Sequence, residues 1–189
     1  MDHLWTPWRY AYITDNDVTM RKGVPQELAA WTGDLGCVFC NMIAAADYAI
    51  EHGMSVDEAE CLAGIVLRGT KAFICLNRYP YTSGHIMVVP YEHEASLAAL
   101  DPPIARELMD LTQQSERALN RVYVPDGINM GLNLGRAAGA GVADHLHLHA
   151  LPRWIGDTNS MTVISETRVL PEVLPTTWRR LREAFAALV

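Results

Sequence analysis

The chain has 189 residues, of which 50% are hydrophobic and 20% charged, and its formal net charge is −7. A chain this apolar buries enough surface to offset its ordering entropy, so the composition excludes a disordered protein. No run of 18 apolar residues is present, and we therefore expect no membrane-spanning helix. The acidic balance disfavours a protein that coats nucleic acid, but a small anionic ligand needs only local positive potential. The length fits one domain with extensions.

The cysteines and the first residues indicate the compartment. The opening Met1-Asp-His-Leu-Trp5 lacks the basic and apolar stretches of a signal peptide. Together with four cysteines, this predicts a protein of the reducing cytoplasm. Cys61 and Cys75 lie in apolar surroundings and are expected to be packing residues. Cys37 and Cys40 are spaced as C-x-x-C.

The first half of the chain begins with an aromatic-rich segment. Residues 1–36 contain many Trp, Tyr, Pro and Gly residues with weak periodicity, which predicts an irregular arm packed on a core or on a second subunit. Ser55 and Glu58 match a capping box at the start of a helix over 55–67. After it, the pattern predicts two strands, over 71–77 and 85–90, joined by a turn.

The second half predicts further helices and strands. Asp101 and Pro102 suit the start of a helix over 102–122. The elements expected after it are strands over 127–134, 145–151 and 161–165, a glycine-rich loop over 135–143 and a helix over 176–188. Strand pairs interrupted by helices predict an α+β fold with an antiparallel sheet covered on one face.

Three of the seven histidines fall within five residues, in Asp144-His-Leu-His-Leu-His149. In a strand, His145, His147 and His149 share one face while the two leucines share the other. The histidine face is either a coincidental polar face or a chemical site. One metal ion held by all three is disfavoured, because about 13 Å separates the first and last Cα atoms of such a strand.

The C-x-x-C pair suggests how the histidines divide their roles. A tetrahedral zinc site with two thiolates needs two more ligands, and His93 and His145 are available to Cys37 and Cys40. The alternatives are a redox pair, which would fit better at a helix start after a strand, and two unligated thiols. His147 and His149 would then be left for chemistry. The amides of loop 135–141 favour an anion, and Arg136 and Arg153 could add charge. Such a site suits attack of His147 on phosphorus.

Three motifs in this order resemble the histidine triad (HIT) family. They are Cys37-Val-Phe-Cys40, Gly84-His-Ile-Met-Val-Val-Pro-Tyr-Glu-His93 and His145-Leu-His-Leu-His-Ala-Leu151. The resemblance implies a five-stranded antiparallel sheet with helices in one domain over 37–155. Residues 1–36 would be an N-terminal arm, and 156–189 a C-terminal extension with a strand and an amphipathic helix. The implied assembly is a homodimer, with the sheet extended or packed across it.

The resemblance also implies roles for single residues. His147 matches the nucleophile that becomes nucleotidylated, His149 the residue that contacts the α-phosphate and the leaving group, and His85 a supporting histidine. His145 matches a zinc ligand, which makes zinc a structural cofactor with Cys37, Cys40 and His93. The predicted nucleotide site comprises Phe39, Leu76, Asn77, Asn133, Arg136, Gly139, Gly141 and Trp154.

The flanking sequence is most similar to the bacterial diadenosine tetraphosphate phosphorylase-like branch of the family. Enzymes of that branch cleave diadenosine tetraphosphate with phosphate to give ATP and ADP. This chain departs from its relatives in two places. Asn77 stands where many members have an Asp that holds the ribose, and Gly141 and Val142 stand where relatives have Gln, Ser or Thr. Phosphorolysis, hydrolysis and nucleotide binding with weak catalysis therefore all stay open. A separate alternative is a zinc-dependent hydrolase with an open metal site.

Overall fold

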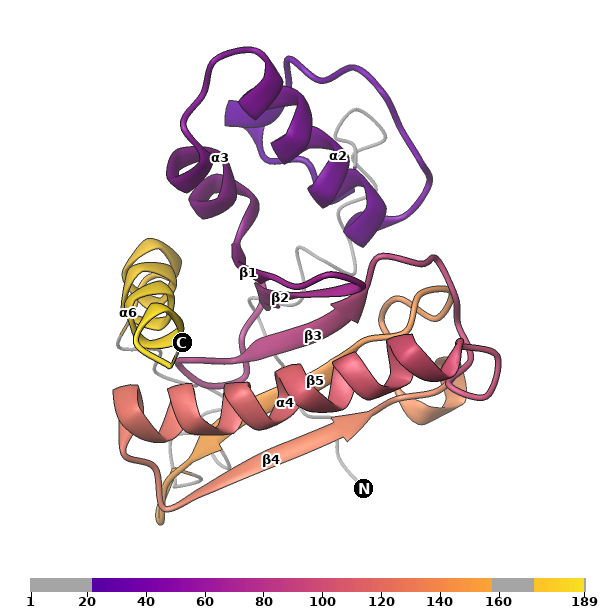
Figure 1. The fold of residues 1–189 in the computed structure, drawn as a ribbon. Coiled ribbons are helices and arrows are strands. Elements are labelled where there is room, and N and C mark those ends of the chain that lie inside the picture. The colour runs from indigo at the N-terminus through magenta and orange to yellow at the C-terminus, as the bar shows by residue number, and fades with distance from the viewer. Residues whose placement is uncertain (1–21, 158–171, 189) are drawn as a thin grey trace, which may run out of the picture.

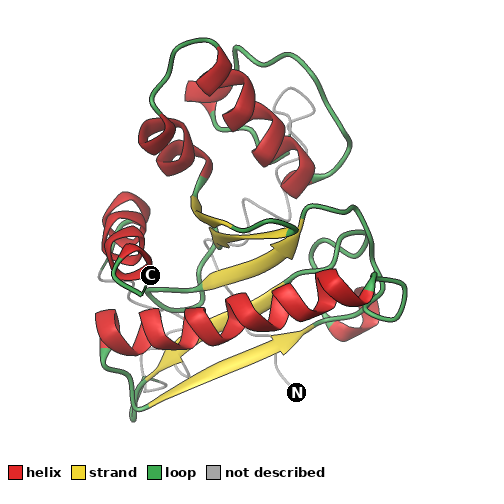
Figure 2. Cartoon of the chain, viewed as in Figure 1, coloured by secondary structure: helices red, strands yellow, loops and turns green. Residues whose placement is uncertain are grey.

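The computed structural model describes residues 22–157 and 172–188, which form one antiparallel sheet with helices on both faces (Figures 1 and 2). The strand order is β1-β2-β3-β5-β4. The strands are β1 (Ile65–Arg68), β2 (Ala72–Leu76), β3 (Ile86–Pro90), β4 (Gly127–Leu132) and β5 (Leu148–Arg153). The helices are η1 (Gln26–Leu28), α2 (Val38–Glu51), α3 (Val56–Ala63), α4 (Pro102–Tyr123), η2 (Arg136–Ala138) and α6 (Leu174–Ala186). The α+β class and the five-stranded sheet are as predicted.

The two faces of the sheet are covered by different helices. On one face, Ile74, Ile86 and Val88 pack in a cluster with apolar residues of α4 and α6. On the other face, Phe73 and Met87 pack with α2, Val24 and Leu28. Every residue of β2 and β3 is therefore buried. The expectation of one covered face was incomplete, because α2 was not predicted. Its first turns are apolar on nearly every position and lack the periodicity of a half-exposed helix.

Several element boundaries differ from the prediction. The helix expected over 55–67 ends at Ala63, because Gly64 adopts a left-handed conformation (φ 79°) and Ile65–Arg68 then pairs as β1. Ser55 caps this helix as predicted, accepting a hydrogen bond from the Glu58 amide. Asp101 is the N-cap residue of α4, but its side chain makes no capping hydrogen bond. The strand expected from 145 begins at Leu148, and the one expected over 161–165 lies outside the described residues.

The C-terminal helix α6 is tied to the rest of the domain by polar contacts. Trp178 donates its indole N–H to the carbonyl of Ile65 in β1. Arg182 bonds the next carbonyl and pairs with Glu60, a carboxylate that is almost fully buried. Within residues 22–157 and 172–188, no helix combines the length and apolar character needed to cross a bilayer.

Glu172 lies just before α6, and we expect its contribution to the stability of the fold to depend on pH. Its carboxylate accepts hydrogen bonds from the Tyr123 and Thr177 hydroxyls and pairs with Arg180. Burial alone would raise the pKa of Glu172, but these donors outweigh it and lower that pKa below its usual 4.5. The stabilisation is therefore complete above about pH 4.5 and is lost as the pH falls through the folded value.

We expect Glu172→Gln to lower the free energy of unfolding by about 1–2 kcal/mol at neutral pH, since Arg180 is partly exposed and its charge is screened. The deficit should shrink as the pH falls below 4.5. Chemical denaturation at several pH values measures it, with Glu116→Gln on the exposed face of α4 as the control. A deficit that grows on acidification would contradict this interpretation.

Gly84 is required by both its backbone and its neighbour. Its φ is +81°, and a Cβ there would lie 2.5 Å from the Tyr123 ring. We expect Gly84→Ala to destabilise the fold by about 2–4 kcal/mol, through backbone strain plus the clash. Gly53 also has a positive φ, but a Cβ there would meet nothing within 4 Å, so Gly53→Ala isolates the strain. Equal falls in Tm for the two variants would show that the Tyr123 contact is unimportant.

Candidate functional site

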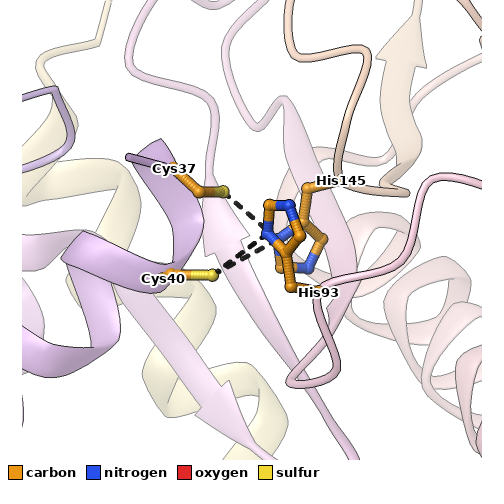
Figure 3. Close-up of side chains that lie close together, drawn as sticks. All are labelled: Cys37, Cys40, His93 and His145. Atoms are coloured by element: carbon orange, nitrogen blue, oxygen red, sulfur yellow. Dashed lines mark hydrogen bonds between the residues drawn. The ribbon is translucent and has the colours of Figure 1, made fainter. Parts of the chain in front are cut away.

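Two cysteines and two histidines converge between the start of α2 and the segments that follow β3 and precede β5 (Figure 3). Cys37 is the N-cap residue of α2 and Cys40 lies in its first turn. His93 follows β3 and His145 precedes β5. The four potential ligand atoms all lie within 4.8 Å of one another. The structure thus brings together the four residues that the sequence predicted as metal ligands.

The distances within this cluster suit a tetrahedral ion. Cys37 Sγ lies 3.3 Å from His145 Nδ1, and Cys40 Sγ lies 3.4 Å from His93 Nδ1. Zinc bonds of about 2.3 Å to sulfur and 2.0–2.1 Å to nitrogen place two tetrahedral ligands about 3.6 Å apart. His145 also donates from Nε2 to the Pro90 carbonyl, at 2.9 Å, which leaves the lone pair of Nδ1 directed toward the thiols. The donor set therefore fits zinc.

The protonation of His145 agrees with a metal site, whereas Cys40 would have to lose its proton on binding the metal. Burial lowers the pKa of His145 to about 4, against the opposing effect of the Pro90 hydrogen bond, so this imidazole is neutral as a ligand must be. Burial and the neighbouring Cys37 raise the pKa of Cys40 to about 11. A bound cation reverses that shift, because it stabilises the thiolate. A redox pair was expected at the start of a helix that follows a strand. The C-x-x-C does lie at the start of a helix, but residues 31–36 before it are not a strand.

His147 is held by the backbone of the preceding histidine. Its Nδ1 donates to the carbonyl of His145 at 2.8 Å, and its side chain is buried. Burial lowers the pKa of His147, with that hydrogen bond opposing the shift. The imidazole is therefore neutral near pH 7, with its proton on Nδ1 and its lone pair on Nε2. This is the form in which a histidine can act as a nucleophile.

A chain of two hydrogen bonds places the proton of His149 on the other ring nitrogen from that of His147. The backbone N–H of Tyr81 donates to His85 Nδ1 at 3.2 Å, so the proton of a neutral His85 is on Nε2. That Nε2 lies 2.9 Å from His149 Nδ1 and donates to it. His149 consequently carries its own proton on Nε2, where it can be donated. The Tyr81 ring packs against His85 at 4.8 Å between centroids.

Tyr81 is a further residue of the candidate site, and the sequence did not predict it. Its contribution to the tautomers is made by a backbone amide, which no side-chain pattern reveals. The turn predicted after Pro80 was the available signal. Backbone N–H groups in a turn are not used in strand pairing and can donate to a nearby side chain.

Two of the residues predicted to bind nucleotide, Phe39 and Asn77, contact this group, and a third, Leu76, directly precedes Asn77 in the chain. Phe39 is 3% exposed and packs against His145 and His147, with ring centroids 5.3 and 5.2 Å apart. Leu76 is buried in the core at the end of β2. Asn77 is half-buried; its amide oxygen accepts from the Tyr79 N–H, and its nitrogen lies 3.5 Å from His85 Nε2.

The loop after β4 has much of its backbone engaged internally. The amides of Ala138, Gly139 and Ala140 donate to the carbonyls of Gly135 or Arg136, so these three do not point toward a ligand as predicted for an anion site. The side chains of Asn133 and Arg136 are at least partly exposed, and Gly139 and Gly141 are exposed. Their predicted part in nucleotide binding stays a prediction.

Arg153 and Trp154, at the end of β5, have structural partners. The Arg153 guanidinium binds both carboxylate oxygens of Asp157 and the side chain of Asn129, so its charge is already paired. Trp154 is half-buried and packs edge-on against Tyr123. Neither contact joins the histidine group, and the role of Trp154 in nucleotide binding stays a prediction.

Comparisons with known proteins agree with this arrangement. Residues 58–154 match the family model described as HIT domain. A Mycobacterium tuberculosis protein named AP-4-A phosphorylase is 37% identical over 186 residues, which cover 98% of this chain and 85% of that protein. A solved structure of a Zn-bound histidine triad family protein from Mycobacterium smegmatis matches with a TM-score of 0.59 and 25% identity, covering 82% of this chain and 97% of the other. A Sulfolobus tokodaii histidine triad nucleotide-binding protein shares the fold, with a TM-score of 0.60 and 24% identity over 80% of this chain and 93% of its own.

Proposed function

The chain belongs to the HIT domain family, and on that premise we propose that it cleaves dinucleoside polyphosphates through a nucleotidyl-histidine intermediate on His147. The observation that carries the proposal is the opposite protonation of two neighbouring imidazoles. His147 presents a lone pair at Nε2, whereas His149 presents a proton there. The similarity to a protein named AP-4-A phosphorylase supports diadenosine tetraphosphate as the substrate.

In the first step, His147 Nε2 attacks the α-phosphorus of the substrate. The phosphorus–nitrogen bond forms as the bond to the bridging oxygen breaks, which releases ATP from diadenosine tetraphosphate and leaves AMP on His147. The Nδ1–H bond to the His145 carbonyl strengthens as positive charge develops on the ring. His149 donates a hydrogen bond from Nε2 to an oxygen of the leaving phosphate and keeps its proton, while its Nδ1 stays bonded to His85.

In the second step, an acceptor attacks the phosphorus and His147 leaves with its original protonation. With phosphate as acceptor the product is ADP, and with water it is AMP. The proton of the acceptor passes to the product phosphate or to solvent, and His149 keeps its own proton on Nε2 throughout. We propose phosphate as the acceptor, on the 37% identity to the named phosphorylase. The alternative, suggested by Gly141 and Val142 in place of polar residues, is a nucleotide-binding protein with weak catalysis.

We infer that Cys37, Cys40, His93 and His145 hold a structural zinc ion, supported by their geometry and by the Zn-bound relative. Bound there, zinc would cross-link α2 to the segments on either side of the histidine strand. A reducing compartment keeps thiolate ligands from oxidation, and none of the four cysteines forms a disulfide, which supports the cytoplasm. We propose that Asn77, which is half-buried beside His85, contacts the ribose, whereas Phe39 and Leu76 are almost fully buried.

We also propose a homodimer. The edge strand β4 is exposed over most of its length, and Met130 in it is 37% exposed. Such an edge is a template for pairing with a second copy. The mass in solution from light scattering tests this, and a monomer at micromolar concentration would contradict it.

The proposed reaction is tested by incubating the protein with diadenosine tetraphosphate, with and without phosphate, and resolving the products. ATP plus ADP, with phosphate required for ADP, is the expected result. ATP plus AMP in both conditions would make water the acceptor. Tight nucleotide binding by calorimetry without turnover would support the binding protein instead.

A further inference from the structure

Phe39 occupies a position between the metal ligands and the nucleophile. It stands within the C-x-x-C, two residues after Cys37 and one before Cys40. Its ring meets His145 edge-on and tilts against His147, at centroid distances of 5.3 and 5.2 Å. The side chain is 3% exposed. The ring packs in the apolar cluster beneath α2, and it also contacts the rings of the two histidines.

We propose that Phe39 is a positioning residue, which holds the His147 imidazole in the orientation for attack and makes that orientation depend on the metal site. This inference rests on the proposed function of His147. The Cys37 and Cys40 ligands fix the first turn of α2, and that turn carries the Phe39 ring. The same four-ligand site also fixes His145, whose carbonyl accepts the Nδ1–H of His147.

Two of the contacts that restrain the imidazole, with the His145 carbonyl and with Phe39, thus depend on one site. The carbonyl of His145 defines which nitrogen carries the proton, but a single hydrogen bond leaves the ring free to tilt about it. Two rings limit that tilt: His149 meets His147 edge-on with centroids 4.9 Å apart, and Phe39 lies against it at 5.2 Å. A displacement of about 1 Å from the attack geometry costs on the order of 10²-fold in rate. The structure therefore assigns Phe39 an effect on kcat.

Phe39→Leu tests the assignment, because leucine keeps the site apolar but removes the flat ring. Phe73→Leu is a matched control: Phe73 is equally buried in the same cluster but packs against Tyr91 instead of a histidine. We expect Phe39→Leu to lower kcat by about 10- to 100-fold with little change in KM. Phe73→Leu should leave both within about threefold, and both variants should keep their zinc.

A second readout does not depend on turnover. With ¹⁵N-labelled histidine at fixed pH, NMR should show His147 of the wild type in one tautomer with sharp ring signals. The signals should broaden or shift in Phe39→Leu, and in the wild type treated with a zinc chelator, but not in Phe73→Leu. If the wild type turned over no dinucleoside polyphosphate, the proposed reaction would fail while this measurement still tested the positioning.

Three results would overturn the assignment. The first is a His147 spectrum unchanged in Phe39→Leu. The second is a fall in kcat of the same size in both variants, which would mark a general packing effect. The third is a rise in KM with kcat unchanged, which would make Phe39 a residue that binds the base.

Discussion

His147→Ala should abolish cleavage of dinucleoside polyphosphates, with a fall in kcat on the order of 10⁴-fold or more. The loss is large because no other group in the site presents a lone pair in the same place: His149 carries its proton on Nε2, and His85 bonds both Tyr81 and His149. Binding should survive, since the residues predicted to contact the base and ribose are unchanged. Steady-state kinetics with product separation, together with calorimetric titration of a nucleotide, measure the two effects.

His52→Ala is the matched control for this experiment. His52 is exposed at the end of α2 and stacks on Tyr48, outside the site. It should keep full activity and rule out a general effect of histidine removal. Because His147 is buried, the fold of the alanine variant is checked by its Tm. Turnover within tenfold of the wild type in a folded His147→Ala protein would contradict the mechanism.

Cys40→Ser should remove zinc and destabilise the domain. Structural zinc sites bind the ion with apparent energies of roughly 10–16 kcal/mol in zinc-finger peptides, and that energy contributes to folding. This domain also has two apolar clusters, so we expect a smaller loss, on the order of 5 kcal/mol. The loss corresponds to a fall in Tm of about 10–20 °C for a chain of this size. Metal analysis should give one zinc per chain in the wild type and little in the variant.

Cys61→Ser is the control, because Cys61 is a free thiol outside the metal cluster. It should keep the zinc and most of the stability. A zinc chelator should lower the Tm of the wild type and of Cys61→Ser, but have little effect on Cys40→Ser. If chelation instead removed activity at unchanged Tm, the metal would be catalytic, and the zinc-dependent hydrolase would be favoured.

The parts of the fold with strong local patterns could be predicted from the sequence. The helix α4 and the strands β2 and β3 were placed within one or two residues, because their periodicity and their bounding Pro and Gly residues are clear. The helix α2 was missed because it is buried against one sheet face while residues 43–46 are apolar at every position. The sequence pattern includes β1 in the preceding helix. Gly64 ends that helix by adopting a positive φ, and the sequence alone does not show that it does so.

The candidate site divides in the same way. The four potential metal ligands can be predicted from residue type and spacing, and the structure brings them together, whereas the role of His147 stays a prediction. The protonation of His149 could not be predicted, because it is determined by the Tyr81 amide through His85. The pairing of Arg153 with Asp157 could also not be predicted from the sequence. It removes one expected source of positive charge from the site. The partners of backbone N–H groups and of charged side chains are determined by the fold, and the local sequence does not show them.

The most direct test of the mechanism is capture of the intermediate on His147. The wild-type protein is mixed with diadenosine tetraphosphate in the absence of phosphate, quenched within milliseconds under conditions that preserve a phosphoramidate, and analysed by mass spectrometry of its peptides. We predict one AMP group on the peptide that contains His147, its disappearance on addition of phosphate as ADP is released, and no such adduct in His147→Ala. Steady turnover with no adduct on that peptide, or with the adduct on another residue, would contradict the account.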